Sequence, residues 1–147
     1  MGEINFNIVS VNISVEKGMR KRPVDKITLR RGHGIEGDAH AGDHHRQVSL
    51  LAMEDIEPLK QKLPDLKPGD FAENITTRGI ELPAIPVGAR ISIGDAELEV
   101  TQIGKKCHSG CEIMELTGDC VMPRRGIFAR VIKGGVINRE STGAYSF

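Results

Sequence analysis

The sequence lacks several features that would assign it to a protein class directly. Basic and acidic residues balance at 20 each, so the chain as a whole does not attract nucleic acid or an anionic membrane, and any anion site must come from local clustering. No apolar run approaches the roughly 20 residues of a membrane-spanning helix. Residues 1–6 also lack the basic and apolar regions of a signal peptide. We therefore expect a cytoplasmic protein that binds neither nucleic acid nor membrane.

Cysteine is scarce as well, with three residues among 147. An odd count leaves at least one thiol unpaired, and the cytoplasm is reducing, so a disulfide framework is not expected. The sequence shows no internal repeat, low-complexity tract or linker. Its length suits one hydrophobic core, and we expect residues 1–147 to form a single domain.

Short apolar runs with a period of two predict a fold made mainly of strands. Apolar residues alternate over 4–15 with one phase slip, which indicates a strand or a bulged strand pair. Segments 24–29 and 127–132 predict further strands, and 89–93 with 96–103 predicts a hairpin. This pattern favours an all-β barrel or sandwich with one or two short helices over a doubly wound sheet.

One segment, 52–63, has a helical period, with acidic residues near its start and lysines near its end. Pro58 must lie in the first turn of this helix or kink it. Two basic segments, 17–23 and 123–126, predict turns, and the first of them is expected to be solvated. The glycine pair at 134–135 predicts a hairpin turn.

The segment 31–47 holds four of the five histidines and four glycines. Glycine allows close backbone approach, so this loop could fold around a small polar ligand that faces Arg46 and the imidazoles. His40 with His44 or His45 has the spacing of a metal pair on a helix, but the glycines argue against a helix. We favour an anion or cofactor pocket over zinc. The alternative is a surface loop whose histidines titrate in solvent.

All three cysteines lie within fourteen positions, from Cys107 to Cys120. The neighbouring lysines and a partly protonated His108 would favour the thiolate form of Cys107 or Cys111, which indicates a reactive or metal-ligating site. Buried structural cysteine is the alternative, and it suits Cys120 best. The segment directly follows the predicted hairpin, so rigid structure would position it.

Motifs spread over nearly the whole chain resemble the MOSC domain family. They lie at residues 34–42 with 46–51, 71–80, 86–88 with 93–94, 102–111 and 125–131. This domain occurs at the C-terminus of molybdenum cofactor sulfurases and as small stand-alone bacterial proteins. The resemblance implies a closed or partly open β-barrel that binds the molybdenum cofactor, molybdopterin, through a cysteine that ligates molybdenum or carries sulfur.

The resemblance also implies the site residues. Relatives with a Cys-x-x-Cys pair indicate Cys111, whereas relatives with one cysteine after a Gln-led strand indicate Cys107, and both remain candidates here for the catalytic and metal-ligating role. The implied cofactor-binding residues are Gly37, Asp38, His40, Arg46, Asn74, Thr76, His108 and Arg125. A thiolate suits molybdenum, and arginines with loop N–H groups suit a phosphorylated pterin. For Asn74 and Thr76, local capping of backbone groups is the alternative reading.

Three functions follow as hypotheses. The first is a protein that carries, sulfurates or delivers the molybdenum cofactor, with a molybdoenzyme or a cysteine desulfurase as its protein partner. The second is a molybdenum-dependent reductase of N-hydroxylated compounds, although such relatives carry a further N-terminal β-domain. The third is a zinc-binding or structural module. The first requires the loop at 34–46 and the cysteine segment to form two walls of one pocket.

Overall fold

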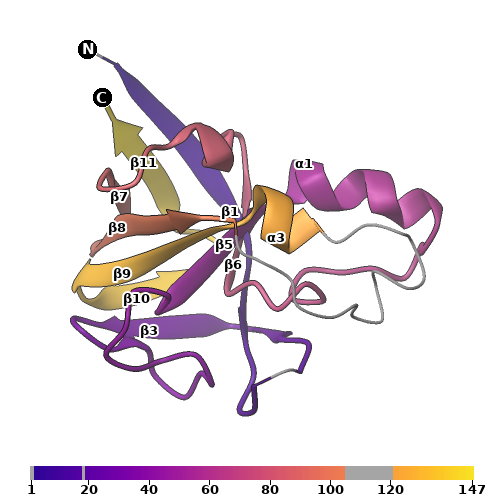
Figure 1. The fold of residues 1–147 in the computed structure, drawn as a ribbon, viewed down its shortest axis with the longest axis horizontal. Helices are drawn as coiled ribbons and strands as arrows, with labels where there is room; N and C mark the ends of the chain where they lie inside the picture. The colour runs from indigo at the N-terminus through magenta and orange to yellow at the C-terminus, as the bar shows by residue number, and fades with distance from the viewer. Residues whose placement is uncertain (1, 18, 105–120) are drawn as a thin grey trace.

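The computed structural model describes residues 2–17, 19–104 and 121–147 (Figure 1). Its elements in chain order are β1 (Glu3–Ile13), β2 (Arg22–Val24), β3 (Lys26–Arg30), β4 (Gly34–Ile35), β5 (Val48–Ala52), α1 (Met53–Ile56), the 3₁₀ helix η1 (Glu57–Gln61), β6 (Ile75–Arg78), the 3₁₀ helix η2 (Leu82–Ala84), β7 (Arg90–Ile93), β8 (Ala96–Ile103), α3 (Val121–Arg125), β9 (Ile127–Lys133), β10 (Gly135–Asn138) and β11 (Thr142–Ser146).

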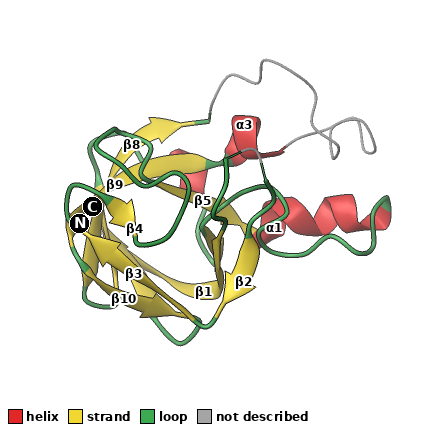
Figure 2. Cartoon of the chain, turned by 90° about the horizontal axis from the view of Figure 1, so that it is seen from below, coloured by secondary structure: helices red, strands yellow, loops and turns green. Residues whose placement is uncertain are grey.

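Seven strands form a closed barrel in the order β11-β7-β8-β9-β5-β6-β1, because β1 also pairs with β11. Neighbours in the barrel are antiparallel except for the parallel pair β5 and β6. The second sheet, β10-β3-β4, lies along one side of the barrel (Figure 2). The prediction of a mainly β barrel is therefore confirmed, and the barrel is closed rather than partly open.

The strands predicted at 4–15, 89–93, 96–103 and 127–132 lie in the barrel, whereas the strand predicted at 24–29 corresponds to β3 in the second sheet. The phase slip within residues 4–15 corresponds to a register shift between Ile8 and Ser10 where β1 pairs with β6. The predicted hairpin forms from β7 and β8, with Ile91 opposite Leu98. Alternation of apolar and polar residues predicted these strands correctly because one face of each strand packs into the barrel.

Strands β5 and β9 bury side chains on both faces. Leu50 and Ala129 pack inside the barrel. Leu51 and Phe128 point outward and pack with Met53 and with other residues of a second cluster, namely Ile56, Leu66, Phe71 and Met122. Helices α1 and α3 cover this outer face, as Figure 1 shows to the right of the barrel. The two-sided burial explains why every residue of β5 is buried.

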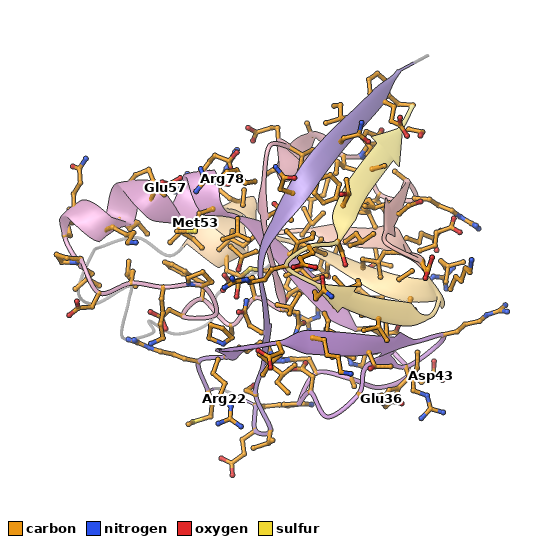
Figure 3. The ribbon with its side chains drawn as sticks, turned by 180° about the vertical axis from the view of Figure 1, so that it is seen from behind. Arg22, Glu36, Asp43, Met53, Glu57 and Arg78 are labelled. Carbon is orange, nitrogen blue, oxygen red and sulfur yellow. The ribbon has the colours of Figure 1, made fainter. Side chains whose placement is uncertain are left out.

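The segment predicted as one helix over 52–63 is three successive elements. Ala52 ends β5, α1 runs only to Ile56, and η1 continues in the tighter 3₁₀ form. Pro58 lies in the first turn of η1, where its missing N–H and its ring exclude a regular α-helical continuation. Arg78 Nη1 donates to Glu57 Oε1 at 3.0 Å, and both side chains are labelled beside the helix in Figure 3. This contact ties η1 to β6.

Two predicted turns are wrong. Residues 123–126 were expected to form a turn, but residues up to Arg125 belong to α3. The glycine pair was expected to join two paired strands, but β10 pairs with β3 and not with β9. A Cβ on Gly134 would lie 2.5 Å from the Leu29 carbonyl oxygen, and one on Gly135 would lie 3.0 Å from the Ala96 nitrogen. Because glycine has no side chain, both positions allow two backbone segments to pass close to each other.

The two ends of the described chain lie together. Gly2 N donates to Phe147 O at 2.6 Å, which continues the β1–β11 pairing that closes the barrel. Within the described residues, no helix combines the length and the apolar character needed to cross a membrane.

Candidate functional site

A small pocket lies outside the barrel, where the histidine-rich loop meets the second apolar cluster. Its lining residues are His40, Arg46, Ser49, Phe71, Ala72, Met122 and Phe128. Its volume is about 30 Å³, the share of one water molecule in the liquid. A larger apolar hollow of about 380 Å³ lies at residues 13–22, but none of the predicted site residues lines it. We place the candidate site at the smaller pocket because two predicted cofactor-binding residues, His40 and Arg46, line it together with residues from distant segments.

The histidine-rich loop is attached to the strand that leads toward the cysteines. His45 Nε2 donates to Gln102 Oε1 at 2.8 Å, and the Thr101 hydroxyl donates to the His45 carbonyl. Gly104 N in turn donates to Gly126 O at 2.6 Å. Gly104, just before the cysteine segment, and Gly126, shortly after it, are therefore neighbours, and β8 brings them close to the histidine-rich loop. Cys107, His108, Cys111 and Cys120 themselves lie outside the described residues.

A buried ion pair lies beneath His40. Lys21 Nζ donates to Asp38 Oδ1 at 2.8 Å, to His40 Nδ1 at 2.9 Å and to Ser14 Oγ at 3.3 Å. The side chains of Lys21 and Asp38 are both 0% exposed. The prediction that residues 17–23 form a solvated turn is thus wrong for Lys21. Nothing in the local sequence separates this lysine from its basic neighbours, because its partners lie in other segments.

Asp38 is held as a carboxylate inside this network. Its Oδ1 also accepts from Ser14 N, and its Oδ2 accepts from His40 N, each at 3.1 Å. Burial opposes ionisation, but the hydrogen bond and charge of Lys21 and the two N–H groups outweigh it and hold the pKa of Asp38 below its ordinary value. The structure therefore places this predicted cofactor-binding residue behind His40, facing protein groups.

Two more loop residues have defined positions. Gly37 is exposed at a turn with φ of 79°, which favours glycine, and its neighbour Asp38 N donates to Ile35 O. Arg46 is exposed at the rim of the pocket, with its guanidinium carbon 5.8 Å from the centroid of the Phe128 ring. No described carboxylate makes an ion pair with Arg46. An exposed cation on an aromatic platform suits contact with an anionic ligand.

Asn74 and Thr76 lie behind the pocket and are fully buried. Asn74 Oδ1 accepts from Ser49 N at 3.0 Å, and its Nδ2 donates to Asn12 O at 3.2 Å. Thr76 Oγ1 accepts from Asn12 Nδ2 at 3.1 Å. These bonds join β1, β5 and β6 and fix the backbone of Ser49, which does line the pocket. Direct binding of a cofactor by Asn74 or Thr76 stays a prediction.

The loop before β6 holds a second buried carboxyl group, Glu73. Its Oε2 accepts from Gly69 N at 3.0 Å and from Thr76 Oγ1 at 2.7 Å, while Oε1 has no partner among the described residues. Burial raises the pKa of Glu73, and these hydrogen bonds only partly oppose the shift. The adjacent Ala72, at φ of 65°, adopts a left-handed conformation that is costly for a residue other than glycine. Neither feature could be predicted from the local sequence.

Arg125 is separated from the loop histidines. Its Nε donates to Asp55 Oδ1 at 3.1 Å, and its Nη2 donates to Glu81. Although burial favours the neutral form, these two carboxylates hold the pKa of Arg125 above its ordinary value. The arginine lines a different hollow of about 210 Å³ with Glu54, Gly79 and Ile80 among its other walls. The structure does not bring it together with His40 and Arg46.

The described residues hold no cluster of metal ligands. Among residues 2–17, 19–104 and 121–147, no three His, Cys, Asp or Glu side chains gather closely enough to hold a metal ion. His44 Nε2 lies 2.8 Å from the His40 carbonyl oxygen, and His40 Nδ1 lies 2.9 Å from Lys21 Nζ, so these two imidazoles, whose spacing suits a metal pair, have separate partners. The three thiols are not part of the described chain.

These features define a class, a small closed β-barrel domain whose polar pocket is built by loops outside the barrel. Residues 36–142 match the MOSC domain, and the chain belongs to this family, which is generally associated with binding of the molybdenum cofactor. No curated protein sequence is significantly similar to the chain.

Solved structures share the fold. YuaD from Bacillus subtilis superimposes with a TM-score of 0.81 at 18% identity, over 99% of this chain and 98% of that one. YiiM from Geobacillus stearothermophilus gives 0.72 at 19% identity, over 97% and 75% of the two chains. YiiM from Escherichia coli gives 0.69 at 18% identity, over 98% and 70%. At these identities the likeness establishes the fold alone.

Proposed function

We propose that the protein binds the molybdenum cofactor on the surface around His40 and Arg46, where the small pocket opens, with Cys111 or Cys107 as molybdenum ligand or persulfide carrier. The observation that carries this proposal is the attachment of the histidine-rich loop to Thr101 and Gln102 at the end of β8. Through this contact, the loop and the strand that leads toward the cysteines share one region of the surface. Family membership supports the choice of cofactor.

The described residues fit the anionic part of such a cofactor. Arg46 offers a charged donor set that no described carboxylate neutralises, and Phe128 beneath it offers an apolar surface. Phosphate oxygens and arginine form strong charge-assisted hydrogen bonds. When bound, the cofactor would supply a molybdenum centre that prefers soft sulfur donors, which matches the thiols in kind. The thiols themselves lie outside the described residues.

The sulfur-carrying form of the proposal requires only a persulfide donor, such as a cysteine desulfurase. The thiolate of Cys111 or Cys107 attacks the outer sulfur of the donor persulfide. A new S–S bond forms, the S–S bond of the donor breaks, and the donor leaves as a thiol. The basic residues beside the thiols would favour the attacking thiolate.

The test is purification of the intact protein from molybdenum-replete cells, followed by assay of bound molybdenum and pterin. The matched variants are Cys107→Ser, Cys111→Ser and Cys120→Ser. We expect the intact protein to retain both components, one of the first two variants to lose most of its molybdenum, and Cys120→Ser to keep it. If the intact protein neither co-purifies with cofactor nor rebinds it, the proposal is wrong.

The alternative functions differ in what they predict for the same preparation. A molybdenum-dependent reductase would turn over N-hydroxylated compounds when given an electron donor, whereas a carrier would not. A zinc-binding module would contain stoichiometric zinc in place of molybdenum. A structural module would contain no metal, and its thiols would show no activated fraction near neutral pH.

A further inference from the structure

The apolar hollow at residues 13–22 lies apart from the small pocket. Its volume is about 380 Å³, within the range of sites that bind a ligand or a protruding side chain. Ile13, Val15 and Met19 supply its apolar walls, and Arg20 and Arg22 line it as well. These residues belong to the end of β1, the start of β2 and the loop between them. Figure 1 shows this loop, in indigo, projecting from the rest of the molecule at the bottom of the view.

Two large apolar side chains of the hollow are exposed to solvent. Val15 is 79% exposed, more than any other large apolar side chain among the described residues, and Met19 is 55% exposed. Both lie on the loop between β1 and β2, and both line the hollow. Neighbouring exposed apolar side chains with a charged rim are typical of an interaction site.

Buried contacts hold both ends of this loop. At its start, Ser14 N donates to Asp38 Oδ1 at 3.1 Å. At its end, Lys21 N donates to Gly69 O at 2.8 Å. Because these ends are already ordered, the surface loses less conformational entropy when it binds than a free segment would. The fold thus presents the two apolar side chains from a fixed base.

Cations outnumber carboxylates around the hollow, although the two balance over the whole chain. The charged residues are Lys17, Arg20, Arg22 and Lys67 against Glu16 and Asp70. The buried carboxylate of Asp70 lies 3.9 Å from Arg20 and 3.7 Å from Lys67, so one anion faces two cations. Lys17 and Arg22 are exposed and make no ion pair with a described carboxylate. The rim of the hollow is therefore complementary to an acidic surface.

The hollow adjoins the candidate site through Ser14. This residue lines the hollow, and its Oγ accepts from Lys21 Nζ at 3.3 Å. The same ammonium contacts Asp38 and His40 beneath the small pocket. A molecule that occupies the hollow therefore lies beside the surface where the cofactor is proposed to bind.

We propose that the hollow at residues 13–22 is a docking surface for a partner protein that presents an apolar side chain flanked by carboxylates. Val15 and Met19 contact the apolar side chain, while Lys17 and Arg22 attract the carboxylates. Such a segment fits better than an anionic membrane, because Glu16 also lines the hollow and would be brought against the anionic lipids. The inference goes beyond the proposed function, since it names the surface that meets the partner.

The test uses the synthetic peptide acetyl-Glu-Asp-Leu-Leu-Asp-Glu-amide, titrated into the ¹⁵N-labelled intact protein. We expect saturable shifts of the backbone signals of residues 13–17 and 19–22. One matched peptide has glycine in place of both leucines, and another has lysine in place of all four acidic residues. Each should bind about tenfold more weakly or less, because one lacks apolar contact and the other is repelled. Absence of saturable shifts, or equal binding of either matched peptide, overturns the proposal.

Variants of the protein locate the binding. Met19→Ser and Arg22→Glu should each weaken binding of the peptide about tenfold, through lost apolar contact and reversed charge. The matched controls are Val87→Ser, at a side chain that is 59% exposed, and Arg139→Glu, at an exposed arginine of another loop. All four side chains are exposed, so the fold should be kept, and the ¹H–¹⁵N spectrum checks this. Equal losses in the test and control variants overturn the proposal.

Other occupants of the hollow give different results. Binding to vesicles of phosphatidylcholine and phosphatidylserine that Met19→Ser abolishes, without binding of the peptide, identifies a lipid surface and overturns the proposal. A dimer in sedimentation that Met19→Ser dissociates identifies a second copy of the chain and also overturns it. Peptide binding does not require the cofactor. A protein that binds the peptide but contains no molybdenum therefore loses the proposed function alone, and the opposite pair of results removes this inference alone.

Discussion

At the scale of single residues, the protein buries two carboxyl groups with opposite consequences. Asp38 has Lys21 within 2.8 Å, so the charged form is stabilised and the pKa is lowered. Glu73 has only neutral donors, one of its oxygens has no partner among the described residues, and burial raises its pKa. The presence or absence of a buried cation therefore decides which carboxyl group favours folding at neutral pH.

Glu73→Gln tests this difference. Because the folded-state pKa of Glu73 is raised, its protonated form supports folding below the unfolded-state value of about 4.3, and that support is lost as pH rises toward the folded-state value. We expect the stability of Glu73→Gln relative to the original protein to rise as the pH increases above about 4.3, by about 1.4 kcal/mol for each unit by which the pKa of Glu73 is raised. Urea unfolding at a series of pH values measures it. A difference that is constant with pH would contradict the prediction.

At the scale of elements, the loop that precedes β6 supports the buried lysine from behind. Lys21 N donates to Gly69 O at 2.8 Å, and Gly69, at φ of 93°, has no room for a side chain. A Cβ there would lie 2.2 Å from the Lys21 carbonyl oxygen. This contact between the loop and the residue just before β2 fixes the backbone of Lys21 and therefore the place of its ammonium.

Gly69→Ala should therefore destabilise the protein more than a glycine substitution with backbone strain alone. Gly88 is the matched control, because its φ is 94° and a Cβ there meets no atom within 4 Å. We expect Gly88→Ala to cost about 1 kcal/mol through strain. Gly69→Ala should cost about 2 kcal/mol more through the clash with the Lys21 backbone. Thermal or urea unfolding of both variants gives the comparison, and equal losses would contradict it.

Elements also differ in how far the sequence specified them. The β7–β8 hairpin was predictable because its turn and its alternation lie within one short stretch. The pairing of β10 with β3 was not, since the glycines that permit it show their purpose only against Leu29 and Ala96. The basic segment before Gly126 was misread as a turn because the apolar cluster that α3 covers comes from β5, α1 and β9.

At the scale of the whole molecule, the barrel depends on the pairing of its first and last strands. Phe6 on β1 lies opposite Gly143 on β11, and its ring fills the space that a side chain at 143 would need. A Cβ on Gly143 would lie 2.2 Å from atoms of that ring, which is 2% exposed. Closure therefore requires a large residue on one strand and glycine on the other.

Gly143→Ala should destabilise the protein by about 1–3 kcal/mol, because the Phe6 ring must move within a packed core. Phe6→Leu replaces the ring with a smaller side chain and leaves room for a methyl group at position 143. The double variant should therefore lose less stability than the sum of the two single variants. Such coupling is expected only for residues in contact. Urea unfolding of the four proteins completes the cycle, and additive losses would argue against this account of closure.

The sequence by itself determined the strands, the family and the candidate residues, because hydrophobic alternation and spaced motifs are local properties of the chain. Only the tertiary structure decided which of those residues share a site. Arg46 lies at the pocket, Arg125 is held by Asp55 and Glu81 elsewhere, and Lys21 is buried under His40. The sequence shows which residues are charged but not which residues they will contact. That depends on which distant segments meet when the barrel closes, and the closed barrel brings residues 21, 38 and 40 into one network.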